Sequence, residues 1–146
     1  MTQDVDLLMT REGLETFKEK FEGRGYALAF SGAKKTFRDT ETQVRIEILI
    51  TGDYPGDGKP KPIAFPDPAV VFTERGGMRV IPIETLIELK LASGMSAPHR
   101  LRDLAEVQDL ITTLKLPLEF ADRLDASVQE TFRELWKSAK SDTENG

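Results

Sequence analysis

The stretch DVDLLM, residues 4–9, alternates strictly between two kinds of side chain. A period of two residues is that of a β-strand, so Asp4 and Asp6 project from one face. The opposite face would carry Val5, Leu7 and Met9. The segment therefore predicts a strand that packs on a core with one side and presents two carboxylates, spaced i and i+2, on the other.

A second stretch, VRIEILI at residues 44–50, repeats this design. Glu47 falls on its less apolar face, beside Arg45 and Leu49. The other face would carry Val44, Ile46, Ile48 and Ile50. We expect a second strand with an acid off its apolar face, and a hairpin turn around Asp39–Thr42 that joins it to the strand before it.

The remaining pattern predicts an α+β fold, with a small mixed β-sheet, helices mainly on one face and a C-terminal helical segment. Residues 52–68 hold five prolines and three glycines and are expected to form a long loop. Residues 1–140 are expected to form one domain, and residues 141–146 a frayed tail. Further strands are expected at 26–30, 69–73 and 78–82, and helices at 11–22, 83–93 (ended by Gly94), 98–115 and about 126–139.

Composition narrows the function classes. The 146 residues include 20 basic and 25 acidic side chains, and a net charge of -5 disfavours binding to duplex DNA. There is no cysteine and one histidine, which excludes disulfides, a thiol nucleophile and most zinc sites. With no apolar leader and no run long enough to cross a membrane, the expected location is the cytoplasm, away from membranes.

The acidic residues Asp4, Asp6 and Glu47 are the candidate ligands of a metal site. Two carboxylates on one strand face can reach one hard cation, or a pair of cations about 4 Å apart. The same spacing arises by chance in a chain this acidic, so two solvated side chains are the alternative interpretation. Glu47 favours the metal site if its strand lies beside that of Asp4 and Asp6, because clustered acids in partly buried surroundings repel unless a cation neutralises them.

These motifs resemble the minimal nucleotidyltransferases of the polymerase-β superfamily, in particular the group related to abortive-infection toxins. Thr2, Asp4, Val5, Asp6 and Leu7 match that superfamily's acid-x-acid strand. Glu47 stands where a third carboxylate is expected, although Asp is commoner there. The likeness continues into the later helices through Lys90, Arg102, Asp103, Glu106, Val107, Leu110 and Ile111.

The resemblance implies transfer of a nucleoside monophosphate from a nucleoside triphosphate to an acceptor hydroxyl. Asp4, Asp6 and Glu47 would hold two Mg²⁺ ions and form the catalytic centre. Lys90 would contact the triphosphate, or it extends from an apolar helix into solvent. Arg102 would also bind the nucleotide, or it forms an ion pair. The acceptor would be a small molecule, a protein or an RNA end, the last served by a basic patch of Lys34, Lys35, Arg38, Lys59 and Lys61.

The family also has a Gly-Gly or Gly-Ser turn upstream of the acid pair, which grips the triphosphate. Only Met1, Thr2 and Gln3 precede Asp4 here. One expectation is a start assigned or cloned too late, with the strand upstream of Met1, which would give an active nucleotidyltransferase. The other is a truncated relative that keeps the scaffold without the grip. The alternative function is then a catalytically degenerate interaction module, such as a regulatory or toxin-antitoxin partner. An open sheet edge would favour a homodimer or a partner protein.

Overall fold

The computed structural model describes residues 4–28 and 36–145 and shows a mixed α+β protein. The chain divides into two compact units, and each is described by itself. The sheet unit comprises Met1–Asp53 and Phe65–Val71, and the helical unit comprises Tyr54–Ala64 and Phe72–Gly146. The α+β class expected from the sequence is confirmed.

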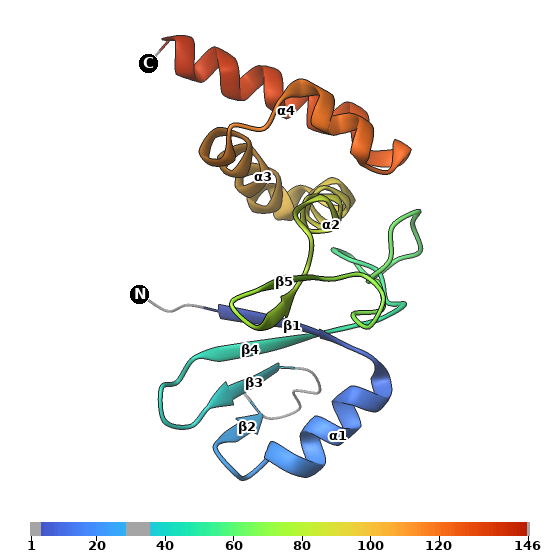
Figure 1. The fold of residues 1–146 in the computed structure, drawn as a ribbon, viewed down its shortest axis with the longest axis vertical. Helices are drawn as coiled ribbons and strands as arrows, with labels where there is room; N and C mark the ends of the chain where they lie inside the picture. The colour runs from blue at the N-terminus through green and yellow to red at the C-terminus, as the bar shows by residue number, and fades with distance from the viewer. Residues whose placement is uncertain (1–3, 29–35, 146) are drawn as a thin grey trace. The chain divides into compact units, whose positions relative to one another are not determined.

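The sheet unit contains a four-stranded mixed sheet and one helix (Figure 1). Its strands lie in the order β1-β4-β3-β2, with β1 and β4 parallel and the other pairs antiparallel. The chain thus passes from β1 through α1 to the far edge and returns strand by strand until β4 lies against β1. The elements are β1 (Asp4–Met9), α1 (Arg11–Phe21), β2 (Tyr26–Leu28), β3 (Thr36–Asp39) and β4 (Arg45–Ile50).

Helix α1 covers the apolar face of this sheet. The Thr10 hydroxyl caps the helix by accepting the Gly13 N–H at 3.0 Å. Leu14 is buried against the sheet, and the Phe17 ring meets Phe37 edge-on at 5.0 Å. The same core contains Ile46, Ile48 and Ile50 of β4. Alternation within β4 therefore places its isoleucines inward and leaves Glu47 exposed on the other face.

A tight turn joins β3 to β4 at the predicted position. The Asp39 carboxylate accepts the backbone N–H groups of Thr42 at 3.1 Å and Glu41 at 2.8 Å. These hydrogen bonds hold the pKa of Asp39 below its usual value of 3.8. The predicted hairpin around Asp39–Thr42 is confirmed, and it fixes the register of β4 against β3.

The proline-rich segment 52–68 contains no helix or strand, as expected. Within the sheet unit, Gly52 N–H donates to the Phe65 carbonyl and Phe65 N–H donates to the Asp53 carbonyl, each at 2.9 Å. These two hydrogen bonds join residues 52–53 to Phe65 and close the loop between them. The prolines of this loop have no backbone N–H to donate, which explains why the hydrogen-bonding pattern of a β-strand does not continue through it.

The strand expected at residues 69–73 is wrong. Asp67 and Pro68 begin a turn instead, because the Asp67 carboxylate accepts the Ala69 N–H at 2.9 Å and its carbonyl accepts that of Val70 at 3.0 Å. In the helical unit, β5 (Thr73–Arg75) pairs with β6 (Met78–Val80) around a two-glycine turn at 76–77. The turn was predicted correctly, and the first strand lies closer to it than expected.

Three helices form the rest of the helical unit: α2 (Ile83–Ser96), α3 (Leu101–Leu114) and α4 (Ala126–Asn145). Two 3₁₀ helices connect them, η1 (Pro98–Arg100) and η2 (Leu118–Arg123). None of the helices in the described residues is long and apolar enough to cross a membrane. The core between the helices contains Ile87, Leu91, Val107, Ile111, Phe120, Leu124, Val128 and Phe132.

Three helix boundaries differ from the sequence expectation by more than one residue. Gly94 does not end α2, which runs on to Ser96. Residues 98–100 form a 3₁₀ helix, so α3 proper begins at Leu101. Helix α4 continues past residue 139 to Asn145. Gly94 stays helical because Leu104 of α3 packs against its bare backbone, a long-range contact that outweighs glycine's low helix propensity.

Candidate functional site

The sheet's exposed face brings two of the predicted acids side by side. In the parallel β1–β4 pair, Asp6 lies opposite Glu47. Paired residues of adjacent strands project to the same face, and the strands are about 4.8 Å apart. Both side chains are exposed. The strand adjacency on which the candidate metal site depends is therefore confirmed.

Asp4 occupies the adjoining position of the same row. By strand alternation it falls on the face of Asp6, and it is in register with Arg45 of β4. The side chain of Asp4 lies outside what the structure describes, so only its backbone position is known. Its position on β1 is compatible with a place on the same sheet face as Asp6 and Glu47. Its role as a metal ligand stays a prediction.

Two arginines share this face, and the sequence reasoning gave them no role there. Arg45 is in register with Asp4, and Arg38 of β3 is in register with Arg45. Arg38 also donates to the Gln43 side chain at 3.3 Å. Acids and guanidinium groups therefore occupy neighbouring strand positions. The signal was present in the sequence, because Arg45 precedes Glu47 by two residues and must share its face.

Exposure changes the electrostatics of the acid face. Sequence reasoning assumed partly buried surroundings, whereas Asp6 and Glu47 face solvent. Two exposed charges about 5 Å apart in water repel by about 1 kcal/mol. Nearby arginines offset a repulsion of that size, so this face can persist without a cation. Its suitability for Mg²⁺ consequently rests on donor chemistry, not on relief of strain.

The donors themselves suit a hard divalent cation. Carboxylate oxygens are the protein ligands that Mg²⁺ prefers, and one or two of them commonly suffice when substrate phosphates and water complete the shell. Among the side chains that the structure describes, which exclude Asp4, no three His, Asp or Glu residues gather as metal ligands. Asp6 and Glu47 thus fit a Mg²⁺ site in which the protein supplies two carboxylates and the substrate supplies phosphate oxygens.

Lys90 and Arg102 meet in the helical unit around one carboxylate. The Lys90 ammonium forms an ion pair with Glu106 of α3. Arg102 Nε lies 3.8 Å from Glu106, one turn away on the same helix. Lys90 therefore links α2 to α3, and its role at a triphosphate stays a prediction. Arg102 thus has an ion-pair partner within its own helix and not on another element, and its role at a nucleotide stays a prediction.

The neighbouring polar residues also hold α2 and α3 together. The Ser93 hydroxyl donates to the Asp103 carboxylate at 2.6 Å. Ser93 is buried and its hydroxyl is satisfied by this bond. Asp103, which the resemblance placed in the family's later motif, thus makes an interhelical contact.

The residues of the basic patch considered for RNA are divided between the two units. Lys34 and Lys35 lie outside them. Arg38 belongs to the sheet unit, whereas Lys59 and Lys61 belong to the helical unit. The Lys61 ammonium donates to the carbonyls of Pro55 and Lys59 and to the Asp57 carboxylate, at 2.8, 2.6 and 2.7 Å. That side chain stabilises its own loop.

Comparison with known proteins adds no relative. No protein-family model, no curated protein and no solved structure matches this chain. Assignment of a function therefore depends on the residues themselves. The most informative group is the acid face of the sheet unit, formed by Asp6 and Glu47 with Asp4 at the adjoining position.

Proposed function

We propose that the acid face binds Mg²⁺ together with a nucleoside triphosphate and supports transfer of the nucleoside monophosphate to an acceptor hydroxyl. The observation that carries this proposal is the register of β1 on β4, which sets Asp6 opposite Glu47 on an exposed face. The resemblance of this acid pattern to polymerase-β-type nucleotidyltransferases supplies the reaction class. The same registers place Arg45 and Arg38 at neighbouring positions.

Each residue has a distinct task in this proposal. Asp6 supplies carboxylate oxygens to the metal, with Asp4 as a second ligand from the same strand. Glu47 completes the ligand set and accepts the proton of the attacking hydroxyl. Arg45 binds phosphate oxygens through its planar guanidinium fork, which suits bidentate contacts to phosphate. When bound, Mg²⁺ would neutralise the triphosphate and the leaving pyrophosphate.

The binding step is tested by thermal melting with Mg²⁺ alone, each nucleoside triphosphate alone and each Mg²⁺-triphosphate pair. A ligand at about 100 times its Kd stabilises a protein by about 2.7 kcal/mol, which raises the melting temperature by about 5 °C or more. We expect such a rise only with metal and triphosphate together. Asp6→Asn and Glu47→Gln should remove it. Glu41→Gln, an exposed acid in the β3–β4 turn, should retain it.

The chemical step is tested with triphosphates labelled at the α-phosphorus, incubated with candidate acceptors and with the protein itself. Retention of label on an acceptor, absent with Asp6→Asn, would support transfer. If no Mg²⁺-triphosphate pair shifts the melting temperature, the proposal is wrong for this chain. The interaction-module alternative would then be examined by light scattering, where a homodimer or a stable complex is its expected signature.

A further inference from the structure

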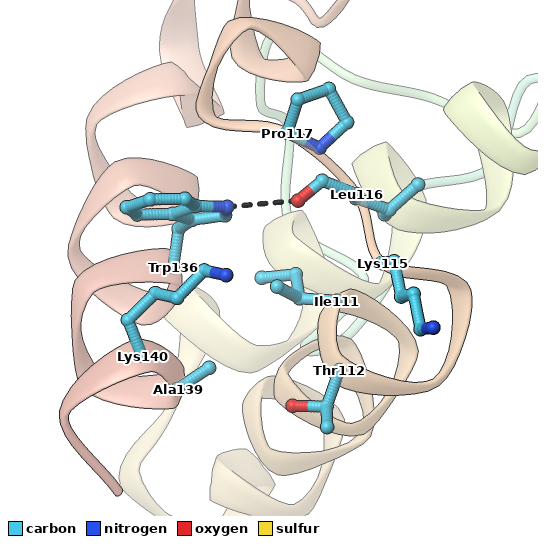
Figure 2. A pocket seen from close by; sticks show the side chains of 8 residues that line it. All are labelled: Ile111, Thr112, Lys115, Leu116, Pro117, Trp136, Ala139 and Lys140. Atoms are coloured by element: carbon cyan, nitrogen blue, oxygen red, sulfur yellow. Dashed lines mark hydrogen bonds between the residues drawn. The ribbon is translucent and has the colours of Figure 1, made fainter. Parts of the chain in front are cut away.

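The helical unit contains a cavity of about 460 Å³ between the end of α3 and one face of α4 (Figure 2). This volume lies within the range of pockets that accept small organic molecules. It involves none of the acid-face residues of the sheet unit. Its lining residues are Ile111, Thr112, Lys115, Leu116, Pro117, Trp136, Ala139 and Lys140.

Most of the lining of this cavity is apolar. Ile111 and Ala139 are buried at its base. The Trp136 indole N–H donates to the Leu116 carbonyl at 2.8 Å, which ties α4 to the turn after α3. Because that donor is already satisfied, the indole presents its hydrocarbon ring to a ligand. A flat apolar wall held by a hydrogen bond is suited to an aromatic or aliphatic group.

The charged groups of the lining are both cations. Among the side chains that the structure describes, Lys115 and Lys140 are the ionisable residues of the lining, and none of the lining residues is a carboxylate. The Lys140 ammonium lies 5.4 Å from the centre of the Trp136 ring, and in Figure 2 it points toward Ile111. Among the side chains that the structure describes, which end at Ser141, no ion pair involves either ammonium. This local charge is opposite to the chain's net charge of -5.

Lys115 reaches the rim through an unusual backbone conformation. It ends α3 with φ 52° and ψ 47°, in the left-handed region that glycine and asparagine adopt most easily. A side chain at this position carries a conformational cost. Lysine nevertheless belongs to the lining of the pocket, although its ammonium points away from Lys140 and Ile111 in Figure 2.

We propose that this cavity binds a small organic carboxylate with an apolar aryl or alkyl body. The body packs on Trp136, Ile111 and Ala139, and the carboxylate accepts hydrogen bonds from the Lys140 ammonium, while Lys115 adds positive charge to the lining. Anionic acceptors bonded to cationic donors form the stronger class of hydrogen bond. Charge complementarity selects an anion over a neutral or cationic molecule with the same body. This site is separate from the proposed nucleotidyl transfer site and does not depend on it.

Trp136 is the chain's single tryptophan, so its fluorescence reports directly on this cavity. The probes are 4-phenylbutyrate and decanoate, each compared with the alcohol and the amine of the same carbon skeleton. We expect both carboxylates to change the Trp136 emission saturably with one ligand per chain. The alcohols should bind about tenfold more weakly, and the amines should not bind.

Variants of the lysines separate charge from packing. Lys140→Gln should weaken carboxylate binding about tenfold and leave alcohol binding nearly unchanged. Lys140→Arg should restore carboxylate binding. Lys115→Gly should weaken it less than Lys140→Gln does, with the fold maintained because glycine suits the left-handed backbone. Lys137→Gln, an exposed lysine of α4 outside the lining, is the matched control.

Two results would overturn the proposal. One is that the alcohols bind as tightly as the carboxylates, which would make the cavity a nonselective apolar site. The other is that Lys140→Gln does not weaken binding of the carboxylates. A carboxylate that binds by calorimetry without changing Trp136 emission lies elsewhere and contradicts the site as well.

Discussion

At the residue scale, the left-handed backbone conformation of Lys115 ends helix α3. The Lys115 N–H donates to the Ile111 carbonyl as in a regular helix, and the left-handed conformation of Lys115 turns the Leu116 N–H onto the same carbonyl at 3.1 Å. Two donors on one carbonyl close the last turn of α3. The chain then leaves the helix in the direction that lets Leu116 accept the Trp136 indole N–H.

Replacing Lys115 separates the backbone cost from the side-chain charge. A non-glycine residue in the left-handed region costs about 1–2 kcal/mol, and glycine's greater freedom in the unfolded chain cancels part of the gain. Lys115→Gly should therefore raise the free energy of unfolding by about 0.5–1 kcal/mol in urea titrations. Lys115→Ala is the control, because it removes the charge and keeps the strained angle. Equal stabilisation by both variants would assign the effect to charge instead.

At the element scale, α2 and α3 approach each other closely because Gly94 has no side chain. A Cβ built at Gly94 would lie 2.6 Å from Leu104 Cδ2 and 3.2 Å from the Leu104 backbone nitrogen. Two polar contacts accompany this approach, the Ser93–Asp103 hydrogen bond and the Lys90–Glu106 ion pair. The same glycine that the sequence indicated as a helix end is thus a packing residue.

Substitution at Gly94 measures this packing. Alanine gains about 1 kcal/mol of helix propensity, but overpacking a close contact typically costs about 1–3 kcal/mol. We expect Gly94→Ala to lower the free energy of unfolding by about 1 kcal/mol in chemical denaturation. In a Leu104→Ala background the side-chain clash is absent, so the same substitution should be neutral or stabilising. Stabilisation by Gly94→Ala alone would contradict the close approach.

At the scale of the whole molecule, two groups of carboxylates pull the pH dependence of stability in opposite directions. The Lys61 hydrogen bond lowers the pKa of Asp57, and the Ser127 hydrogen bonds lower the pKa of Asp125, as the turn lowers that of Asp39. Partial burial raises the pKa of Glu88 above 4.5, against the hydrogen bond it accepts from the Asp125 N–H at 2.7 Å.

The signs follow from proton linkage. Depressed pKa values mean that Asp39, Asp57 and Asp125 contribute stability above their usual value of 3.8, and this is lost as pH falls through their lowered pKa values. The raised pKa of Glu88 favours the folded state below 4.5, and that contribution is lost as pH rises through the raised value. Stability should therefore fall in acid, while ionised Glu88 is unfavourable near neutrality.

Glu88→Gln tests the second effect, since the glutamine carbonyl can still accept the Asp125 N–H. The variant's free energy of unfolding, relative to the parent protein, should be higher at about pH 7 than at about pH 4. Glu119→Gln removes an exposed carboxylate of the same unit and controls for the change in net charge. A difference between Glu88→Gln and the parent that is the same at both pH values would contradict the raised pKa.

Local patterns in the sequence determined most of the strands, the hairpin turns and most of the helices. Alternation at residues 4–9 and 44–50 is enough to put isoleucines inward and acids outward, because strand side chains point to opposite faces in turn. Asp39 and the glycine pair at 76–77 specified their turns through short-range hydrogen bonding and positive φ angles. Mixed α+β class followed from the same patterns, and so did Asp6 and Glu47 as candidate site residues.

Tertiary structure decided which of these parts meet. Only strand pairing set Glu47 opposite Asp6 and put Arg45 beside Asp4, because register depends on contacts between residues about forty positions apart in the chain. The contact with Leu104 keeps Gly94 within a helix. The Trp136 indole joins α4 to the turn after α3 and forms one wall of the 460 Å³ cavity. The hydrophobic periodicity of a segment shows which of its faces is apolar. It does not show which other segment packs against that face, because that depends on contacts between residues far apart in the chain.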